Sequence, residues 1–332
     1  MATPPSQALP PPRHTPVMIV TGYLGSGKTT LLNEVLRNAA FADSAVIINE
    51  FGEIGLDHLL VTKASENILL TDAGCLCCVT LDSLPETLTD LFGRRARGEV
   101  PPFSRVFIET TGLADPAPII RLLLRHPIVG HFARLQGVVC VVDALHGEKT
   151  LSGEREAAAQ IAQADRLVIS KTDLTGARAQ ATLTACLGAL NSSAEIMLSG
   201  AGAQAIFSAA APILPWLDLI EGPAPHDHSH GPHEGGVGSE SFWITAPASW
   251  PGLAIWTDWA RRRFGERLLR CKGILQLQGQ PGGVVLHGVQ GQFDTTRLPA
   301  WPGGDARSRL VLIGRELDRR EIQASLSQLS TD

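Results

Sequence analysis

The chain carries a glycine-rich motif, G-Y-L-G-S-G-K-T, at residues 22–29, between the apolar run 17–20 and a helix-forming stretch. This is the context of a phosphate-binding P-loop. Its glycines turn backbone N–H groups toward the phosphates, Lys28 adds positive charge, and the Thr29 hydroxyl reaches Mg²⁺. The motif therefore predicts binding of a nucleoside triphosphate by Gly22, Gly25, Ser26, Gly27, Lys28, Thr29 and Thr30.

A second motif places an acid at the end of an apolar run, in R-V-F-I-E-T-T-G at residues 105–112. In P-loop proteins a carboxylate there holds Mg²⁺ directly or through water, and the following glycine N–H can reach the terminal phosphate. We expect Glu109 and Thr29 to bind Mg²⁺, and Lys28, Glu109 and Gly112 to act in catalysis. Without a P-loop, such an acid is more often a solvated strand end.

The sequence S-K-T-D at residues 170–173 also follows an apolar run and resembles the guanine-reading N-K-x-D motif. A carboxylate accepts N1–H and the 2-amino hydrogens of guanine, whereas adenine offers neither donor on that edge. We therefore predict that Asp173 selects GTP over ATP and that Lys171 lays its aliphatic stem over the base. Ser170 lacks the amide of Asn and is expected to orient the loop less well. The alternative is an exposed loop that carries a lysine and an acid.

Three of the six cysteines, Cys75, Cys77 and Cys78, lie within four residues. Thiolates this close repel one another unless a cation holds them, and sulfur ligands suit Zn²⁺, Co²⁺ or Cu⁺. The cluster predicts a metal site whose fourth ligand comes from elsewhere in the chain. Buried thiols or a redox pair are the alternatives. The remaining cysteines are predicted to be buried thiols: Cys140, Cys186 and Cys271.

Two further segments carry candidate metal ligands. Residues 49–57 hold three acids and two glycines where a nucleotide-sensing segment would lie, and Glu50 is the expected carboxylate near the cysteine metal. A plain acidic loop is the alternative. A histidine-rich tract could capture metal weakly, or be a solvated linker with no metal role. Its histidines are His226, His228, His230 and His233.

Composition restricts the partners. The net charge is −5, and no stripe of Lys or Arg forms, which argues against a nucleic-acid partner. The sequence contains no apolar run long enough to span a membrane, and residues 1–16 lack the apolar core of a signal peptide. We therefore expect a cytoplasmic protein. Whether it forms a homo-oligomer is left open.

Alternating β-branched and helical stretches predict a doubly wound α/β domain with a mainly parallel sheet. The expected order is a proline-rich disordered tail (1–16), a P-loop GTPase domain (17–218), a His-rich linker (219–240) and a smaller α+β domain (241–330). The expected strands are 17–21, 45–49, 67–70, 105–109, 137–143, 166–170, 195–198, 241–246, 268–278, 283–289 and 309–314. The expected helices are 29–37, 81–97, 116–124, 154–164, 177–190, 251–264 and 316–326.

Taken together, these motifs, with N-E-F-G-E at 49–53 and G-C-L-C-C at 74–78, resemble the CobW-type GTPases. That family includes cobalt and zinc metallochaperones and nitrile hydratase activators. The resemblance implies a Mg²⁺-dependent GTPase, slow without a partner or metal, whose cysteine turn binds Zn²⁺ or Co²⁺ in the GTP state and yields it to a client metalloprotein. Three sulfurs favour Zn²⁺ over Co²⁺ by affinity order.

Three other functions compete with this interpretation. The protein could be a metal-storage or sensing module with a structural nucleotide, as the histidine tract suggests. It could be a nitrile hydratase-type activator for cobalt or iron insertion. A P-loop kinase would leave the cysteines and Asp173 without a role.

Overall fold

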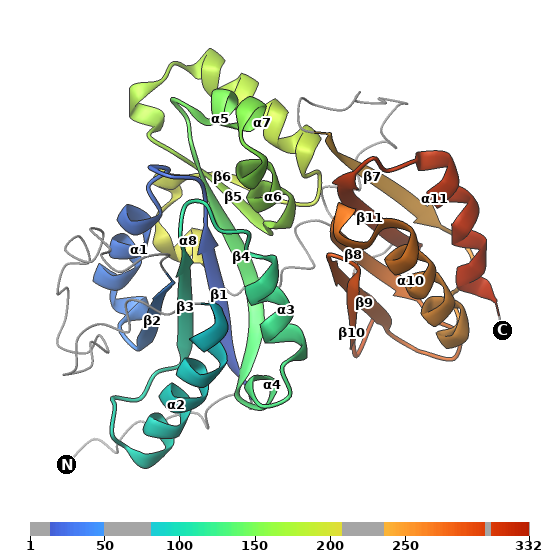
Figure 1. Cartoon of the computed structure of the whole chain (residues 1–332), viewed down its shortest axis with the longest axis horizontal. Helices are drawn as coiled ribbons and strands as arrows, with labels where there is room; N and C mark the ends of the chain where they lie inside the picture. The colour runs from blue at the N-terminus through green and yellow to red at the C-terminus, as the bar shows by residue number, and fades with distance from the viewer. Residues whose placement is uncertain (1–13, 50–80, 208–235, 303–306, 332) are drawn as a thin grey trace, which may run out of the picture.

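The computed structural model describes residues 14–49, 81–207, 236–302 and 307–331. In the first part of the chain, six parallel strands form one sheet in the order β2-β3-β1-β4-β5-β6 (Figure 1). This order brings the ends of β1, β3 and β4 together at the centre of the sheet. The strands are β1 (Thr15–Thr21), β2 (Ser44–Asn49), β3 (Arg105–Thr110), β4 (Ala133–Asp143), β5 (Arg166–Ser170) and β6 (Glu195–Leu198).

Helices cover both faces of this sheet, as the crossover pattern predicted. On one face, α1 packs with α8 over Val20 and Val141. The other helices cover the opposite face. They bury two apolar clusters there, one under α2 and α3 and one under α6 and α7. The helices are α1 (Lys28–Arg37), α2 (Leu84–Arg97), α3 (Ala117–Arg125), α4 (Val129–Phe132), α5 (Gly147–Gly153), α6 (Arg155–Gln163), α7 (Ala177–Leu190) and α8 (Ala203–Phe207).

The C-terminal part forms a five-stranded antiparallel sheet in the order β10-β9-β8-β11-β7. Alternate residues of β11 point to opposite faces: Leu310 and Leu312 pack under the helices, and Val311 and Ile313 face the first domain. The elements are β7 (Val237–Ile244), α10 (Trp250–Phe264), β8 (Leu268–Gln276), β9 (Gly283–Val289), β10 (Gln292–Arg297), β11 (Ser308–Arg315) and α11 (Arg319–Ser325). This is the smaller α+β unit predicted from the sequence.

The two sheets are joined by shared apolar packing. Val311 and Ile313 of β11 belong to the same buried cluster as residues of α6 and α7, and Val289 of β9 belongs to the cluster under α3. Figure 1 shows the C-terminal sheet beside α3 and α6, with α10 and α11 on its far side. Both faces of the central strands β8, β9 and β11 are therefore buried, and the two domains pack as a continuous unit.

The element boundaries differ from expectation in several places. β1 begins at Thr15, within the expected tail, because Thr15 and Pro16 pair with β4. β7 begins at Val237, within the expected linker, because Val237 pairs with Arg315. The helices α4, α5 and α8 and strand β10 were not predicted. The expected strand 67–70 lies outside the described residues. Within the described chain, no helix combines the length and apolarity needed to cross a bilayer.

Candidate functional site

The glycine-rich loop connects the end of β1 to α1, and its glycines allow a close approach to neighbouring strands. Gly25 and Gly27 have left-handed φ values of 71° and 97°, which glycine adopts without steric cost. At Gly22, a Cβ would lie 2.3 Å from the Val141 carbonyl oxygen of β4. The loop thus requires glycine at these positions to close over the helix N-terminus, as a phosphate cradle does.

Lys28 lies at the start of α1 and is largely buried. Its ammonium donates to the backbone oxygens of Gly22, at 2.8 Å, and of Tyr23, at 3.2 Å. The charge is therefore held inside the loop, beside the place where phosphates would bind. Thr30 is exposed on the same turn of the helix.

Thr29 and Glu109 are in direct hydrogen-bond contact. Glu109 pairs in register with Val20 near the end of β1, so its carboxylate lies beside the first turn of α1. The Thr29 hydroxyl donates to Glu109 Oε1 at 2.8 Å, and Glu109 is only 5% exposed. A hydroxyl and a carboxylate are oxygen donors of the kind that Mg²⁺ prefers, so these residues fit a magnesium ion.

Gly112 touches the P-loop directly. A Cβ at Gly112 would lie 2.7 Å from both the Cα and the backbone nitrogen of Leu24. Gln160 of α6 donates to the Gly112 oxygen at 3.1 Å and to the Ala114 oxygen at 3.0 Å. The segment after β3 is therefore seated against the loop, with Gly112 where it could contact a terminal phosphate.

The base-reading motif is built differently from the sequence expectation. Ser170 donates its hydroxyl to the Ser26 oxygen of the P-loop at 2.6 Å, so the short side chain does tie the two loops together. Lys171 adopts a left-handed φ of 54°, and its ammonium lies 2.6 Å from Asp143 Oδ2. Asp173 is exposed on the following turn. The motif thus borders the P-loop, with Asp173 accessible to a ligand.

Two family models match the chain. Residues 16–198 match the family described as CobW/HypB/UreG, nucleotide-binding domain, and residues 237–330 match the cobalamin synthesis protein cobW C-terminal domain. The chain belongs to the CobW family. This chain is therefore a P-loop GTPase.

The similarity to known proteins extends over nearly the whole chain. The zinc chaperone YjiA of Escherichia coli is 29% identical over 94% of this chain and 98% of its own length. The zinc chaperone CobW of Pseudomonas aeruginosa is 31% identical over 94% of this chain and 90% of its own length. A crystal structure of Zn(II)-bound YjiA GTPase from E. coli superposes with a TM-score of 0.73 at 26% identity, covering 96% of this chain and 99% of that one.

A cavity of about 300 Å³ lies beside the P-loop of this CobW family chain. It is lined by loop residues such as Tyr23, by the end of β4, and by α5 and α6. Asp143 at its rim accepts from Lys171, the Leu145 amide and His146. Burial opposes ionisation of Asp143, but these hydrogen bonds outweigh it and hold its pKa below the usual value. Asp143 is thus a charged partner of Lys171 that the sequence motifs did not indicate.

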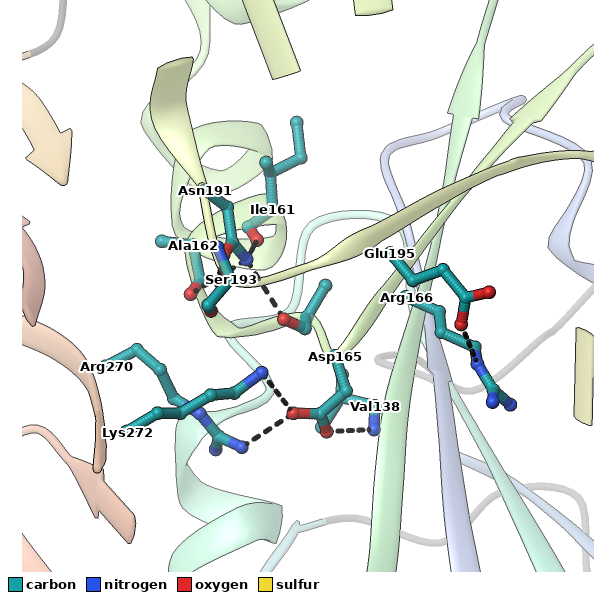
Figure 2. Close-up of polar contacts among 11 residues, drawn as sticks. Val138, Ile161, Ala162, Asp165, Arg166, Asn191, Ser193, Glu195, Arg270 and Lys272 are labelled. Carbon is teal, nitrogen blue, oxygen red and sulfur yellow. Dashed lines mark hydrogen bonds and ion pairs between the residues drawn. The ribbon is translucent and has the colours of Figure 1, made fainter. Parts of the chain in front are cut away.

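A buried charge cluster joins the nucleotide domain to the C-terminal domain (Figure 2). Asp165 immediately precedes β5 and accepts from the Val138 amide at 2.8 Å. Its other oxygen lies 3.0 Å from Arg270 Nη2 and 2.8 Å from Lys272 Nζ, both on β8. Burial opposes the charge, but Lys272 and Arg270 overcome it and hold the pKa of Asp165 far below its ordinary value. The strand that leads into the base-reading motif is therefore tied to the C-terminal domain.

The predicted zinc or cobalt ligands lie outside the described residues. These are Glu50, Cys75, Cys77, Cys78, His226, His228, His230 and His233. Among the described residues, no group of three or more His, Cys, Asp or Glu side chains could hold a metal ion.

The other cysteines behave largely as expected. Cys140 and Cys271 are buried, and burial raises the pKa of Cys140 to about 12, so its thiol stays protonated at neutral pH. The expectation of burial was wrong for Cys186, which is partly exposed on α7 because its helix face borders solvent.

Several residues of the site were not found by sequence reasoning. Gln160, Gln163 and Asp143 act through side-chain contacts with segments distant in sequence, and such contacts leave no local pattern. Asp115, just before α3, accepts from the Ala117 amide at 2.9 Å. Its contacts with Gln163 and Gln290 became visible only in the fold.

Proposed function

We propose that this chain is a GTP-hydrolysing metallochaperone that binds Zn²⁺ in its GTP-bound state and delivers it to a client metalloprotein. The geometric observation that supports this most is the hydrogen bond between Thr29 and Glu109 at the mouth of the P-loop. It brings together the oxygen donors that a Mg²⁺–GTP complex requires, next to the buried Lys28. The cysteine motif and the zinc chaperones among its relatives supply the metal part of the proposal.

The proposed nucleotide chemistry divides the roles among the residues already placed. Backbone N–H groups of residues 22–29 and the Lys28 ammonium bind the phosphates, and Thr29 and Glu109 hold Mg²⁺, which neutralises charge on the phosphates. The Gly112 N–H contacts the terminal phosphate. Asp173 reads the N1 and 2-amino hydrogens of guanine, and Lys171 covers the base. Ser170 holds the base-reading turn against the P-loop.

The proposed metal site uses Cys75, Cys77 and Cys78, with Glu50 as a carboxylate ligand. Thiolate-rich sites favour Zn²⁺ over Co²⁺ by affinity order, and the relatives are named zinc chaperones. Co²⁺ is the second candidate for the cargo. The relative in Schizosaccharomyces pombe is named a zinc-regulated GTPase metalloprotein activator, which supports a metalloprotein as the client.

A metal titration with matched variants tests the assignment of the site. Zn²⁺ would be titrated into the full-length protein with a GTP analogue and Mg²⁺, against a competing chromophoric chelator. We expect Cys77→Ala to weaken Zn²⁺ binding by orders of magnitude while GTP affinity is unchanged. Cys186→Ala, which changes a partly exposed cysteine on α7, is the control and should bind Zn²⁺ normally. Equal Zn²⁺ affinity in both variants would contradict the proposed site.

A further inference from the structure

The hairpin between β9 and β10 carries a residue in an unfavourable backbone conformation. Gln290 has φ of 47° and Gly291 has φ of 73°, so both residues of the turn are left-handed. Such turns favour Asn, Asp or Gly, and a residue with a longer side chain is strained in the left-handed conformation. A strained residue persists where its surroundings impose the conformation, often at a functional position. The Gln290 side chain has hydrogen-bond partners outside its own hairpin.

Those partners lie in the nucleotide domain. Gln290 Nε2 donates to Asp115 Oδ2 at 2.7 Å, and Gln290 Oε1 accepts from Arg121 of α3. The neighbouring Val289 is buried in the apolar cluster under α3. The hairpin tip is thus inserted into the nucleotide domain, with both polar ends of the Gln290 amide engaged there.

Asp115 ends the segment that begins at the magnesium residue Glu109. Its Oδ1 accepts from the Ala117 amide at 2.9 Å and from Gln163 at 2.7 Å, which leaves Oδ2 for Gln290. Three residues earlier, Gly112 packs against the Leu24 backbone, where a Cβ would not fit. The segment is therefore anchored by α6 on one side and by the C-terminal hairpin on the other.

We propose that Gln290 is a positioning residue for GTP hydrolysis, which holds Gly112 against the P-loop through Asp115. The C-terminal domain then completes the active site of the nucleotide domain without touching the nucleotide. Because hydrolysis depends on donors placed at the terminal phosphate, loosening this anchor should slow the chemical step more than binding. The proposal rests on the GTPase activity of the chain.

The first test separates positioning from folding. Gln290→Gly removes the amide but relieves the left-handed strain, so the turn itself should not be destabilised. We expect kcat for GTP hydrolysis by the full-length protein to fall about tenfold, with KM for GTP within about twofold of wild type. Gln292→Ala, which changes an exposed glutamine on the same hairpin, is the control and should keep the wild-type kcat. An unchanged kcat in Gln290→Gly, or a loss shared equally with a lowered Tm and GTP affinity, would overturn the proposal.

The second test reverses the polarity of the hydrogen bond. Gln290→Glu alone sets two carboxylates against each other, and Asp115→Asn alone sets two amide N–H groups together, so each should lower kcat. In the double variant the new amide at position 115 can donate to the new carboxylate at position 290, and the amide oxygen can still accept from Ala117 and Gln163. We expect the double variant to recover kcat to within about twofold of wild type, a coupling that contacting residues show. Additive losses would overturn the proposal.

These assays distinguish the GTPase activity of the chain from the role of Gln290. Absence of GTP hydrolysis in the wild-type protein would overturn both the enzyme class and the role of Gln290. Wild-type hydrolysis that survives Gln290→Gly unchanged would overturn the role of Gln290 alone.

Discussion

Ser170 shows how a short side chain can take over a structural task in a base-reading loop. The sequence comparison with N-K-x-D led us to expect a weaker orientation of the loop, because Ser lacks an amide. In the structure the Ser170 hydroxyl donates to the Ser26 oxygen at 2.6 Å, and Gly27 lies close enough that a Cβ there would be 3.7 Å from Ser170. Because the two loops pack closely, the Ser170 hydroxyl reaches the P-loop without the longer side chain of Asn.

Specificity for the base should follow from Asp173 alone. Asp173→Asn replaces an acceptor of the guanine N1–H and 2-amino hydrogens with a group that also donates. We expect GTP affinity to fall and affinity for xanthosine triphosphate, which has an oxygen at the 2-position, to rise. Competition binding with GTP, ATP and xanthosine triphosphate measures this. Unaltered discrimination between GTP and ATP would show that another group reads the base.

The carboxylate of Glu109 should govern the dependence on magnesium. Glu109→Gln keeps the size and can still accept from Thr29, but it removes the negative charge beside the metal. We expect GTP hydrolysis to fall by about 10- to 100-fold and the Mg²⁺ concentration for half-maximal rate to rise. Steady-state rates across a Mg²⁺ titration measure both effects. An unshifted titration curve would remove Glu109 from the magnesium site.

Much of the site could be predicted because local motifs report local geometry. The P-loop requires its glycines, and the acid after an apolar strand requires only that β3 lie beside β1. Gln160, Gln163 and Gln290 could not be predicted, since each acts on a segment far away in the sequence. The helix α5 was missed because Gly147 and Gly153 form its ends and disfavour a helix by propensity.

At the scale of elements, the approach of two loops defines the site. The segment after β3 reaches the P-loop because β3 and β1 are parallel neighbours whose carboxyl ends meet. Gly112 brings that segment into contact with Leu24, and the α6 glutamines hold it there. Contact between these two backbones, which only glycine permits, is therefore the feature on which hydrolysis should depend.

Gly112→Ala tests this contact. The added Cβ would lie 2.7 Å from the Leu24 backbone, so one of the two loops must move. We expect kcat for GTP hydrolysis to fall by about tenfold or more, because displacing a group by about 1 Å can cost far more than that in rate. Gly176→Ala, where a Cβ would meet nothing within 4 Å, is the control. Equal rates in the two variants would show that the contact has no catalytic role.

At the scale of the whole molecule, the C-terminal domain contacts the nucleotide domain through two sets of polar side chains. Arg270 and Lys272 bind Asp165, just before the strand that leads to Asp173. Gln290 binds Asp115, just after the segment that carries Gly112. The sequence predicted two domains connected by a linker, but it did not predict these contacts between the domains. The composition of a linker does not indicate which side chains meet across a domain interface. The domains should therefore respond to the nucleotide together.

Acid should weaken this interface in a definite pH range. His287 lies opposite Lys272 on β9, and burial together with the Arg270 charge lowers its pKa to about 3. Between about pH 6.5 and 3, the unfolded chain takes up this proton and the folded chain does not, so the free energy of unfolding falls as pH falls, by at most about 1.4 kcal/mol per unit. Asp165, whose pKa is also lowered, adds a further loss below about pH 4.

Denaturant unfolding of His287→Gln measures the histidine contribution. We expect the free energy of unfolding of this variant to change less between about pH 6.5 and about pH 4.5 than that of wild type. Identical pH slopes in the two proteins would show that His287 is not held neutral in the folded interface.

In the proposed function, the nucleotide controls the affinity of the protein for Zn²⁺. The most direct measurement is the Zn²⁺ affinity of the full-length protein with Mg²⁺ and either a non-hydrolysable GTP analogue or GDP, by chelator competition. We predict Zn²⁺ binding at least about tenfold tighter with the GTP analogue, a coupling of about 1.4 kcal/mol, with an equal tightening of the analogue by Zn²⁺. Equal Zn²⁺ affinities in the two nucleotide states would contradict the account.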